Sequence, residues 1–183
     1  MSINATSVAF GSVVINDAAT QSLTLTSTGT APVTINAAAI TGAGFTVSGA
    51  TFPLTLNLNQ AVTLSLQFDP TTTGAATGQL TITSNSSTNG TVVIALSGTG
   101  APHEVDLNWD APSSSSDPVA GYHVYRSPDG GTTYQQLSSV AATQTAYVDS
   151  TAVSGQAYDY VVKSFDASGA ESAPSNMTSV TIP

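Results

Sequence analysis

Residues 96–109 divide this sequence into two parts that differ in composition. Gly98, Gly100 and Pro102 are expected to end the strand that precedes them, and alternate apolar residues in Val105–Trp109 then begin a new one. No lysine or arginine occurs before this stretch, whereas both cations and nine of the eleven acids lie within or after it. The sequence therefore predicts a domain boundary here.

The apolar pattern on both sides of this boundary is typical of β-strands. The clearest alternation is in Val62–Phe68, and no stretch combines helical periodicity with capping residues. Turn residues separate about seven short strands before the boundary, a number typical of a sandwich domain. We therefore expect an all-β protein of two tandem immunoglobulin-like β-sandwiches, residues 1–101 and residues 102–183.

The first domain carries a set of spaced residues that is known from one family of sandwiches. They are Phe10-Gly11, Ser27-Thr28-Gly29, Phe45, Leu58-Asn59-Gln60, Phe68-Asp69-Pro70, Gly74, Gly78 and Leu96-Ser-Gly-Thr-Gly100. With them the domain resembles the Hydin-like domains, which are related to major-sperm-protein folds and occur in bacterial surface proteins of the choice-of-anchor D type. Ser27 stands where that family usually has Asn, and Leu58-Asn59 replaces its usual Pro-Gly. The resemblance implies a scaffolding role and protein contacts.

The second domain carries a different pattern. It consists of Trp109, Gly121-Tyr122, Val124-Tyr-Arg126, Tyr147-Val-Asp149, Tyr158-Asp-Tyr160 and Gly169-Ala-Glu-Ser172. This arrangement resembles a bacterial fibronectin type III domain. The resemblance implies that Tyr158 is the corner tyrosine, whose hydroxyl bonds a nearby backbone group. We also expect Trp109 to be the buried centre of this sandwich.

Charge and composition exclude several classes of partner. The formal net charge is −9, and only 7% of the residues are charged. Such a surface repels phosphate backbones and anionic membranes, so we expect no nucleic-acid binding and no membrane binding. No apolar run is long enough to span a bilayer. The chain has no cysteine, which excludes disulfides, thiolate metal sites and a cysteine nucleophile.

Motifs for catalysis or metal binding are also missing. No Gly-x-Ser-x-Gly nucleophile elbow occurs. His103-Glu104, expected in the linker, lacks the second histidine of a zinc protease, and His123 is interpreted as an exposed strand residue. Asp166 and Glu171 lie too close together for an EF-hand, so an Asp-Gly turn is preferred over a calcium loop. We predict a protein that is not an enzyme and has no catalytic residue, metal ligand or cofactor.

One candidate interaction patch remains, on two strands that are expected to be neighbours. If Tyr122 faces the core, strand alternation turns Tyr125 outward. On the second strand the same alternation turns Val161, Lys163 and Phe165 outward. These four residues would form an apolar patch edged by a lysine. It is ordinary exposed strand surface, or it is covered by the first domain, or it binds a partner or stacks on a sugar.

The function we predict is that of a non-catalytic extracellular module, a spacer, adhesion or protein-interaction scaffold in a bacterial secreted or cell-surface protein. Two alternatives stay open: an accessory, carbohydrate-associated module of a secreted polysaccharide-degrading enzyme, and a subunit of an extracellular filament or virion. In the last case, self-association would use unpaired edge strands. The expected partners are proteins or surface polysaccharide. Residues 1–20 lack the features of a signal peptide, so we expect the export signal to lie outside this sequence.

Overall fold

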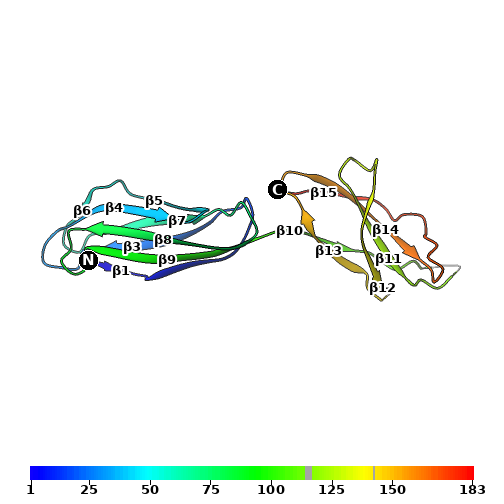
Figure 1. The fold of residues 1–183 in the computed structure, drawn as a ribbon, viewed down its shortest axis with the longest axis horizontal. Helices are drawn as coiled ribbons and strands as arrows, with labels where there is room; N and C mark the ends of the chain where they lie inside the picture. The colour runs from blue at the N-terminus through cyan, green and yellow to red at the C-terminus, as the bar shows by residue number, and fades with distance from the viewer. Residues whose placement is uncertain (114–116, 142) are drawn as a thin grey trace. The chain divides into compact units, whose positions relative to one another are not determined.

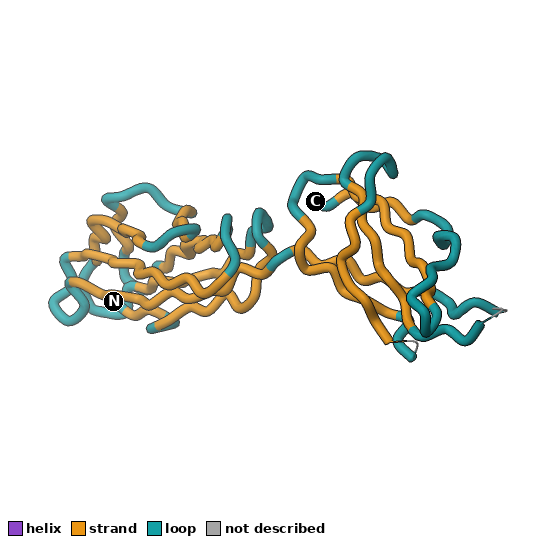
Figure 2. The backbone as a smooth tube through the Cα atoms, turned by 45° about the vertical axis from the view of Figure 1, so that its right-hand side comes forward, coloured by secondary structure: helices purple, strands orange, loops and turns teal. Residues whose placement is uncertain are grey.

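The computed structural model describes residues 1–113, 117–141 and 143–183, which form strands and loops (Figure 1, Figure 2). The prediction of an all-β fold is confirmed. Contacts divide the chain into two compact units, Met1–Ala101 and Pro102–Pro183. In the described ranges, no helix has the length and apolar character needed to cross a membrane.

The first unit is a sandwich of two sheets. One sheet is built from β1 (Ser2–Ile3), β3 (Ala19–Thr26), β7 (Ala61–Phe68) and β5 (Phe45–Ser48), in that spatial order. The other is built from β2 (Ser7–Val14), β9 (Thr91–Ala101), β8 (Gly74–Ser84), β4 (Val33–Thr41) and β6 (Leu54–Leu56), in that order. β2 runs parallel to β9, and the other pairs are antiparallel. The short strands β1 and β6 were not expected from the sequence.

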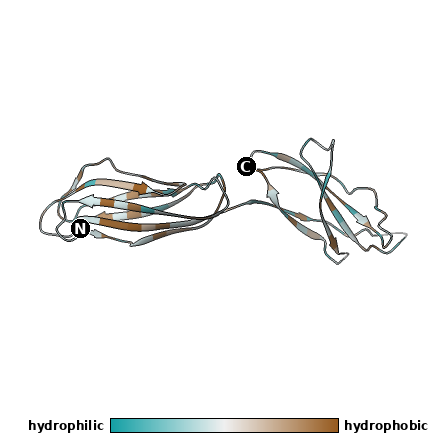
Figure 3. Ribbon diagram, viewed as in Figure 1, coloured by the Kyte–Doolittle hydropathy of each residue, from teal (hydrophilic) through white to brown (hydrophobic). Residues whose placement is uncertain are grey.

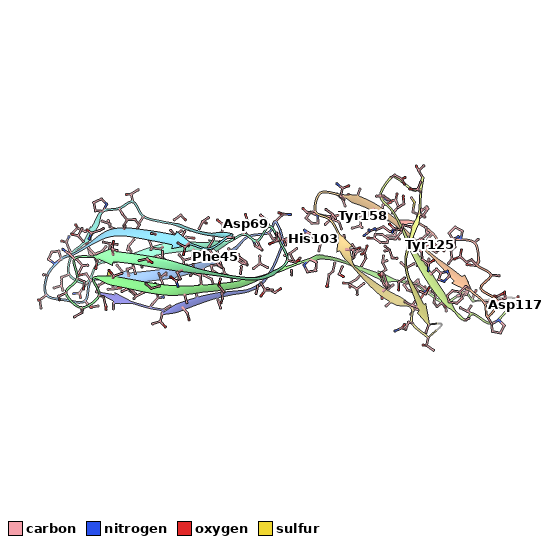
Figure 4. The ribbon with its side chains drawn as sticks, in the orientation of Figure 1. Phe45, Asp69, His103, Asp117, Tyr125 and Tyr158 are labelled. Carbon is pink, nitrogen blue, oxygen red and sulfur yellow. The ribbon has the colours of Figure 1, made fainter. Side chains whose placement is uncertain are left out.

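Alternation along these strands builds the core between the sheets. On β7, Leu64, Leu66 and Phe68 have no exposed surface, and the residues between them are more accessible. The Phe68 ring stacks on Phe45 with centroids 4.6 Å apart, and Phe10 lies 5.8 Å from Phe68. Figure 4 marks Phe45 inside this unit, and Figure 3 shows apolar bands along the strands. The aromatic cluster therefore holds the two sheets against each other.

The glycines near the boundary do not end a strand, which corrects the expectation from the sequence. β9 continues through Gly98 and Gly100 to Ala101, next to Pro102. A Cβ at Gly98 would lie 2.5 Å from the Phe68 ring. Glycine is therefore required at this position because an aromatic side chain of the facing sheet fills the space above it.

The second unit pairs a two-stranded sheet with a four-stranded one. The smaller sheet consists of β10 (His103–Asn108) and β13 (Ala146–Ala152). The larger has the order β12 (Gln135–Ala141), β11 (Gly121–Ser127), β14 (Ala157–Phe165) and β15 (Thr178–Thr181). Between the sheets lie Ala152, Tyr158, Tyr160 and Ile182, with Val105, Leu107, Leu137 and Val180 packed against them.

His103 is the first residue of β10 and not part of a linker. It pairs with Ala152 on β13 and is 7% exposed. Its Nε2 atom is buried without a hydrogen-bond partner. The histidine is therefore a strand residue of the second unit.

Candidate functional site

The outer face of β11 and β14 carries the residues that the sequence singled out. Tyr122 and Val124 face the core and are 2% and 0% exposed, so His123 and Tyr125 lie on the opposite face. The two strands are antiparallel, and His123 is opposite Lys163 in the register. Side chains from both strands therefore meet on one surface.

Glu171 holds this surface together, although it lies outside both strands. Its Oε1 atom accepts a hydrogen bond from the Tyr125 hydroxyl at 2.5 Å and lies 2.6 Å from Nδ1 of His123. Its Oε2 atom accepts a hydrogen bond from Nζ of Lys163 at 2.9 Å. We call these residues, together with Phe165, the Glu171 cluster.

Ring contacts complete the Glu171 cluster. Phe165 stacks on His123 with centroids 4.4 Å apart and an angle of 23° between the rings. The ammonium group of Lys163 lies 5.0 Å from the centre of the Tyr125 ring, within the range of a cation–π interaction. Gly121 lies opposite Phe165, and a Cβ there would approach the Phe165 ring to 2.5 Å. The glycine leaves the space that Phe165 occupies.

These contacts shift two ionisations in opposite directions. Hydrogen bonds from Lys163, Tyr125 and His123 lower the pKa of Glu171 from 4.5 to about 2. The hydrogen bond to Glu171 and partial burial raise the pKa of Tyr125 from 10.0 to about 12. The carboxylate therefore stabilises the fold above pH 4.5, and this contribution is lost as the pH falls toward 2. The neutral phenol of Tyr125 stabilises the fold below pH 10, and this stabilisation is lost as the pH rises toward 12.

Replacing Glu171 with glutamine should lower the pKa of Tyr125 from about 12 toward 10.0. The amide keeps the shape of the side chain but removes the negative charge that opposes the phenolate. The measurement is a titration of phenolate absorbance, compared between the native chain and E171Q. Glu104→Gln, at an exposed position of β10, is the control and should leave the curve unchanged. Identical curves for E171Q and the native chain would contradict the geometry of the cluster.

Three of the four predicted patch residues, Tyr125, Lys163 and Phe165, belong to the Glu171 cluster. The fourth, Val161, lies opposite Tyr125 in the register but is only 7% exposed. Its burial corrects the expectation of an exposed valine, so the surface is more polar than predicted. Alternation gives the face of a strand residue, but the exposed area depends on what neighbouring side chains cover.

Sequence reasoning missed the role of Glu171. The loop from Asp166 to Ala170 closes tightly, with a hydrogen bond from the Asp166 N–H to the Ala170 carbonyl at 3.1 Å. Glu171 then pairs with Phe165 as an isolated bridge, which carries its side chain back over the strand. The Asp-x-Ser-Gly turn was visible in the sequence and is the signal that could have placed Glu171 beside β14.

The Asp166 carboxylate serves this turn. Its Oδ1 atom accepts hydrogen bonds from the backbone N–H groups of Ser168 at 2.7 Å and Ala170 at 3.1 Å. The hydrogen bond from the Ser168 hydroxyl comes first among the contacts that lower the pKa of Asp166. Among the described residues, no group of three or more possible ligands could hold a metal ion. The turn interpretation accounts for both acids.

Adding a chelator should therefore leave the melting temperature of the chain unchanged. A bound ion that recognised only the native state would raise stability by mass action, and its removal would lower the melting temperature. Thermal unfolding with and without EDTA tests this. A drop of several degrees that calcium restores would show that Asp166 and Glu171 share an ion.

A second charged group in this unit lies between the two sheets. Asp149 on β13 is fully buried, and its Oδ2 accepts hydrogen bonds from Arg126 at 2.7 Å and from the Tyr160 hydroxyl at 2.8 Å. Its Oδ1 accepts a hydrogen bond from the backbone N–H of Thr151 at 2.9 Å. Arg126 also lies 4.5 Å above the ring of Tyr158. The residue whose hydroxyl makes the buried bond is therefore Tyr160, whereas Tyr158 supplies a ring face for Arg126, unlike the corner role expected for it.

Trp109 is not the buried centre of the second unit. It follows the last residue of β10, is half-buried, and contacts Tyr122 edge to face with centroids 5.5 Å apart. Its indole Nε1 atom is buried, and within the described ranges it has no hydrogen-bond partner. The fully buried positions of this unit include Val124 and Asp149 instead. The tryptophan lines an opening of the sandwich.

Comparison with known proteins assigns the first unit. The family model of Cep192 domain 4 matches residues 1–101, which is more than half of the chain. The chain belongs to the Cep192 domain 4 family.

Two curated relatives match less than half of the chain. An amylopullulanase of Thermoanaerobacterium thermosulfurigenes is 36% identical over 84 residues, which is 46% of this chain and 4% of that protein. An amylopullulanase of Thermoanaerobacterium saccharolyticum is 38% identical over 80 residues, 44% of this chain and 6% of that protein. The chain thus corresponds to a small part of the length of these relatives.

Solved structures with similar folds share little sequence with the chain. PapD-like domain 7 of human CEP192 has a TM-score of 0.40 and 15% identity, with 54% of this chain and 83% of that chain covered. The FN1–FN3 domains of chicken CNTN1 have a TM-score of 0.38 and 14% identity, with coverage of 98% and 64%.

Proposed function

We propose that this chain is a non-catalytic extracellular module that works as a spacer or protein-interaction scaffold within a larger secreted or cell-surface protein. The observation that carries the proposal is that its two cationic side chains are engaged in ion pairs within the second unit. Both cations bind carboxylates of the second unit, Arg126 at Asp149 and Lys163 at Glu171. Ion pairs of this kind stabilise a fold, and that use accounts for both cations.

The histidine of the Glu171 cluster supports the same proposal. His123 and Glu171 form a close pair, but the Glu171 carboxylate also accepts hydrogen bonds from Tyr125 and Lys163. A general base needs a carboxylate or imidazole that can reach a substrate proton. A depression of about 240 Å³ includes Phe165, Asp166 and Glu171 in its lining. No serine or threonine of the described residues donates a hydrogen bond to His123 there, so the nucleophile–base pair of covalent catalysis is lacking.

The two units fit tandem sandwiches of extracellular proteins. We propose that residues 1–101 form a Hydin-like domain and that residues 102–183 form a fibronectin type III domain. The motif residues quoted for each family support these assignments, as does the sandwich architecture of each unit. An extracellular location is part of the same proposal.

A second candidate function is an accessory module of a polysaccharide-degrading enzyme. The observation that favours it is the resemblance of part of the chain to segments of two amylopullulanases. Partly exposed aromatic rings at Tyr125 and Phe165 could stack on a sugar ring. This candidate makes the Glu171 cluster the carbohydrate surface.

Native electrophoresis through gels with and without pullulan or soluble starch separates the two candidates. The scaffold proposal predicts unchanged mobility in both gels and no release of reducing sugar. The accessory-module candidate predicts retarded mobility that Tyr125→Ala or Phe165→Ala abolishes. Tyr134→Ala is the matched control, because Tyr134 is an exposed aromatic outside the cluster. Sugar release by the purified chain would contradict both.

A further inference from the structure

The smaller sheet of the second unit is incomplete on one side. It contains only β10 and β13, whereas the sheet that faces it has four strands. An isolated pair of strands is marginal, and sandwiches of this size usually have at least three strands in each sheet. Among the described residues, β10 has hydrogen-bonded strand pairing with β13 alone. Its other edge therefore has no strand partner within the described ranges.

Two openings lie on the unpaired side of β10. One, of about 310 Å³, is lined by residues that include Trp109, Tyr122 and Val162. The other, of about 270 Å³, is lined by residues that include Leu107, Trp109 and Val161. Neither lining contains a residue of β13. Both linings instead include Trp109 and Ser175, so the openings lie between the end of β10 and the segment that leads into β15, on the side away from β13.

At this edge, apolar side chains are incompletely covered and a polar group lacks a hydrogen-bond partner. Val105 and Leu107 pack against the core between the two sheets, but both side chains are only half-buried. The Nε1–H of Trp109 is buried and has no acceptor among the residues that the structure describes. A buried donor without a partner is rare in native structures, so an acceptor brought by a bound segment would satisfy it.

We propose that the free edge of β10 binds an extended segment of a partner protein, in which apolar side chains alternate with lysine or arginine. The segment would pair with β10 as an additional strand. Its apolar side chains would cover Val105 and Leu107 and fill the openings beside Trp109. One of its oxygens would accept the hydrogen bond of the indole.

Charge selects this occupant over the alternatives. Glu104 and Asp106 are exposed and alternate with Val105 and Leu107 along β10, so they lie beside every second residue of an added strand. Antiparallel pairing of two copies of β10 would bring these carboxylates together, which is destabilising. Residues 1–101 contain no lysine or arginine, so the first unit has no basic strand to offer. A basic segment of another protein complements the edge.

The test uses the full chain and two synthetic ten-residue peptides that alternate valine with lysine or valine with glutamate. Trp109 is the only tryptophan, so its emission reports binding at this edge. We expect the lysine peptide to shift the emission to shorter wavelength and to bind about tenfold more tightly than the glutamate peptide. Amide chemical shifts should change in β10. A lysine peptide with N-methylated alternate amides, which cannot pair with the edge, should not bind.

Charge reversal keeps the test independent of folding defects, because both acids are exposed. In Glu104→Lys/Asp106→Lys, the preference should invert in favour of the glutamate peptide. The matched control is Asp17→Lys/Asp69→Lys, which makes the same charge change at exposed positions of the first unit and should keep the native preference. Equal binding of both peptides, binding of neither, or shift changes in the Glu171 cluster would overturn the proposal. So would a dimer of the chain that the lysine peptide does not dissociate, because the occupant would then be a second copy.

Discussion

Replacing Asp149 with alanine should destabilise the second unit by about 3–5 kcal/mol, because it leaves a buried charge without its partner. Arg126, whose side chain is 16% exposed, loses its counterion. The Tyr160 hydroxyl loses the acceptor of its buried hydrogen bond. The carboxylate also bridges the sheets, since Asp149 comes from β13 and both donors come from the facing sheet. Its removal therefore weakens the contact between the sheets as well as the ion pair.

Denaturant unfolding followed by Trp109 emission measures this effect, since the only tryptophan lies in the second unit. The control is Arg126→Met/Asp149→Leu, which removes both charges and should recover much of the lost stability. A loss of less than about 1 kcal/mol in Asp149→Ala, the size measured for exposed ion pairs, would contradict the assignment of a buried pair.

The pH dependence of this pair has a definite sign. Burial alone would raise the pKa of Asp149, but hydrogen bonds from Thr151 and Tyr160 and the charge of Arg126 outweigh it and leave the pKa below 3.8. The contribution is therefore present above pH 3.8 and is lost as the pH falls through the lowered value. The Glu171 cluster loses its contribution over the neighbouring acidic range. The second unit should be the acid-sensitive one, because the first unit has only two acids and no cation.

Local sequence patterns were sufficient to predict the faces of the strands. The alternation that turned Tyr122 inward and Tyr125 outward is present in β11. It follows from strand geometry, which depends on the backbone and not on the rest of the fold. For the same reason the neighbouring strands brought Lys163 and Phe165 to the face of Tyr125. The fold class could be predicted at this level.

Features that depend on the partner sheet could not be predicted in this way. Gly98 has the sequence signature of a strand end, but in β9 it leaves space for the Phe68 ring of the facing sheet. Trp109 has the character of a core residue, but it borders an opening because, among the described residues, no third strand pairs with β10. Glu171 reaches its three partners because a turn brings it back beside Phe165. The alternation of apolar residues does not predict how such a turn closes. In each case the missing information concerns a long-range neighbour.

The first unit depends on its aromatic core and not on charge. Its largest fully buried side chain is Phe68, which stacks on Phe45 and contacts Phe10. Phe68→Ala should therefore destabilise the Cep192 domain 4 unit by about 3–5 kcal/mol, the range for a buried aromatic ring. This unit has no tryptophan, so hydrogen exchange of the amides of β7 and β9 is the measurement. A loss below about 1 kcal/mol would place Phe68 outside the core.

A double-mutant cycle with Gly98 tests whether the glycine serves the Phe68 ring. Gly98→Ala alone should cost about 1–3 kcal/mol, because the added methyl group enters space that the ring occupies. In the background of Phe68→Ala that space is empty, so the same methyl group should cost nothing or restore part of the lost stability. Two effects that simply add would show that Gly98 is required by its backbone and not by the ring. A strong coupling would instead explain why a glycine occupies the interior of a long strand, where its lack of a side chain normally weakens the sheet.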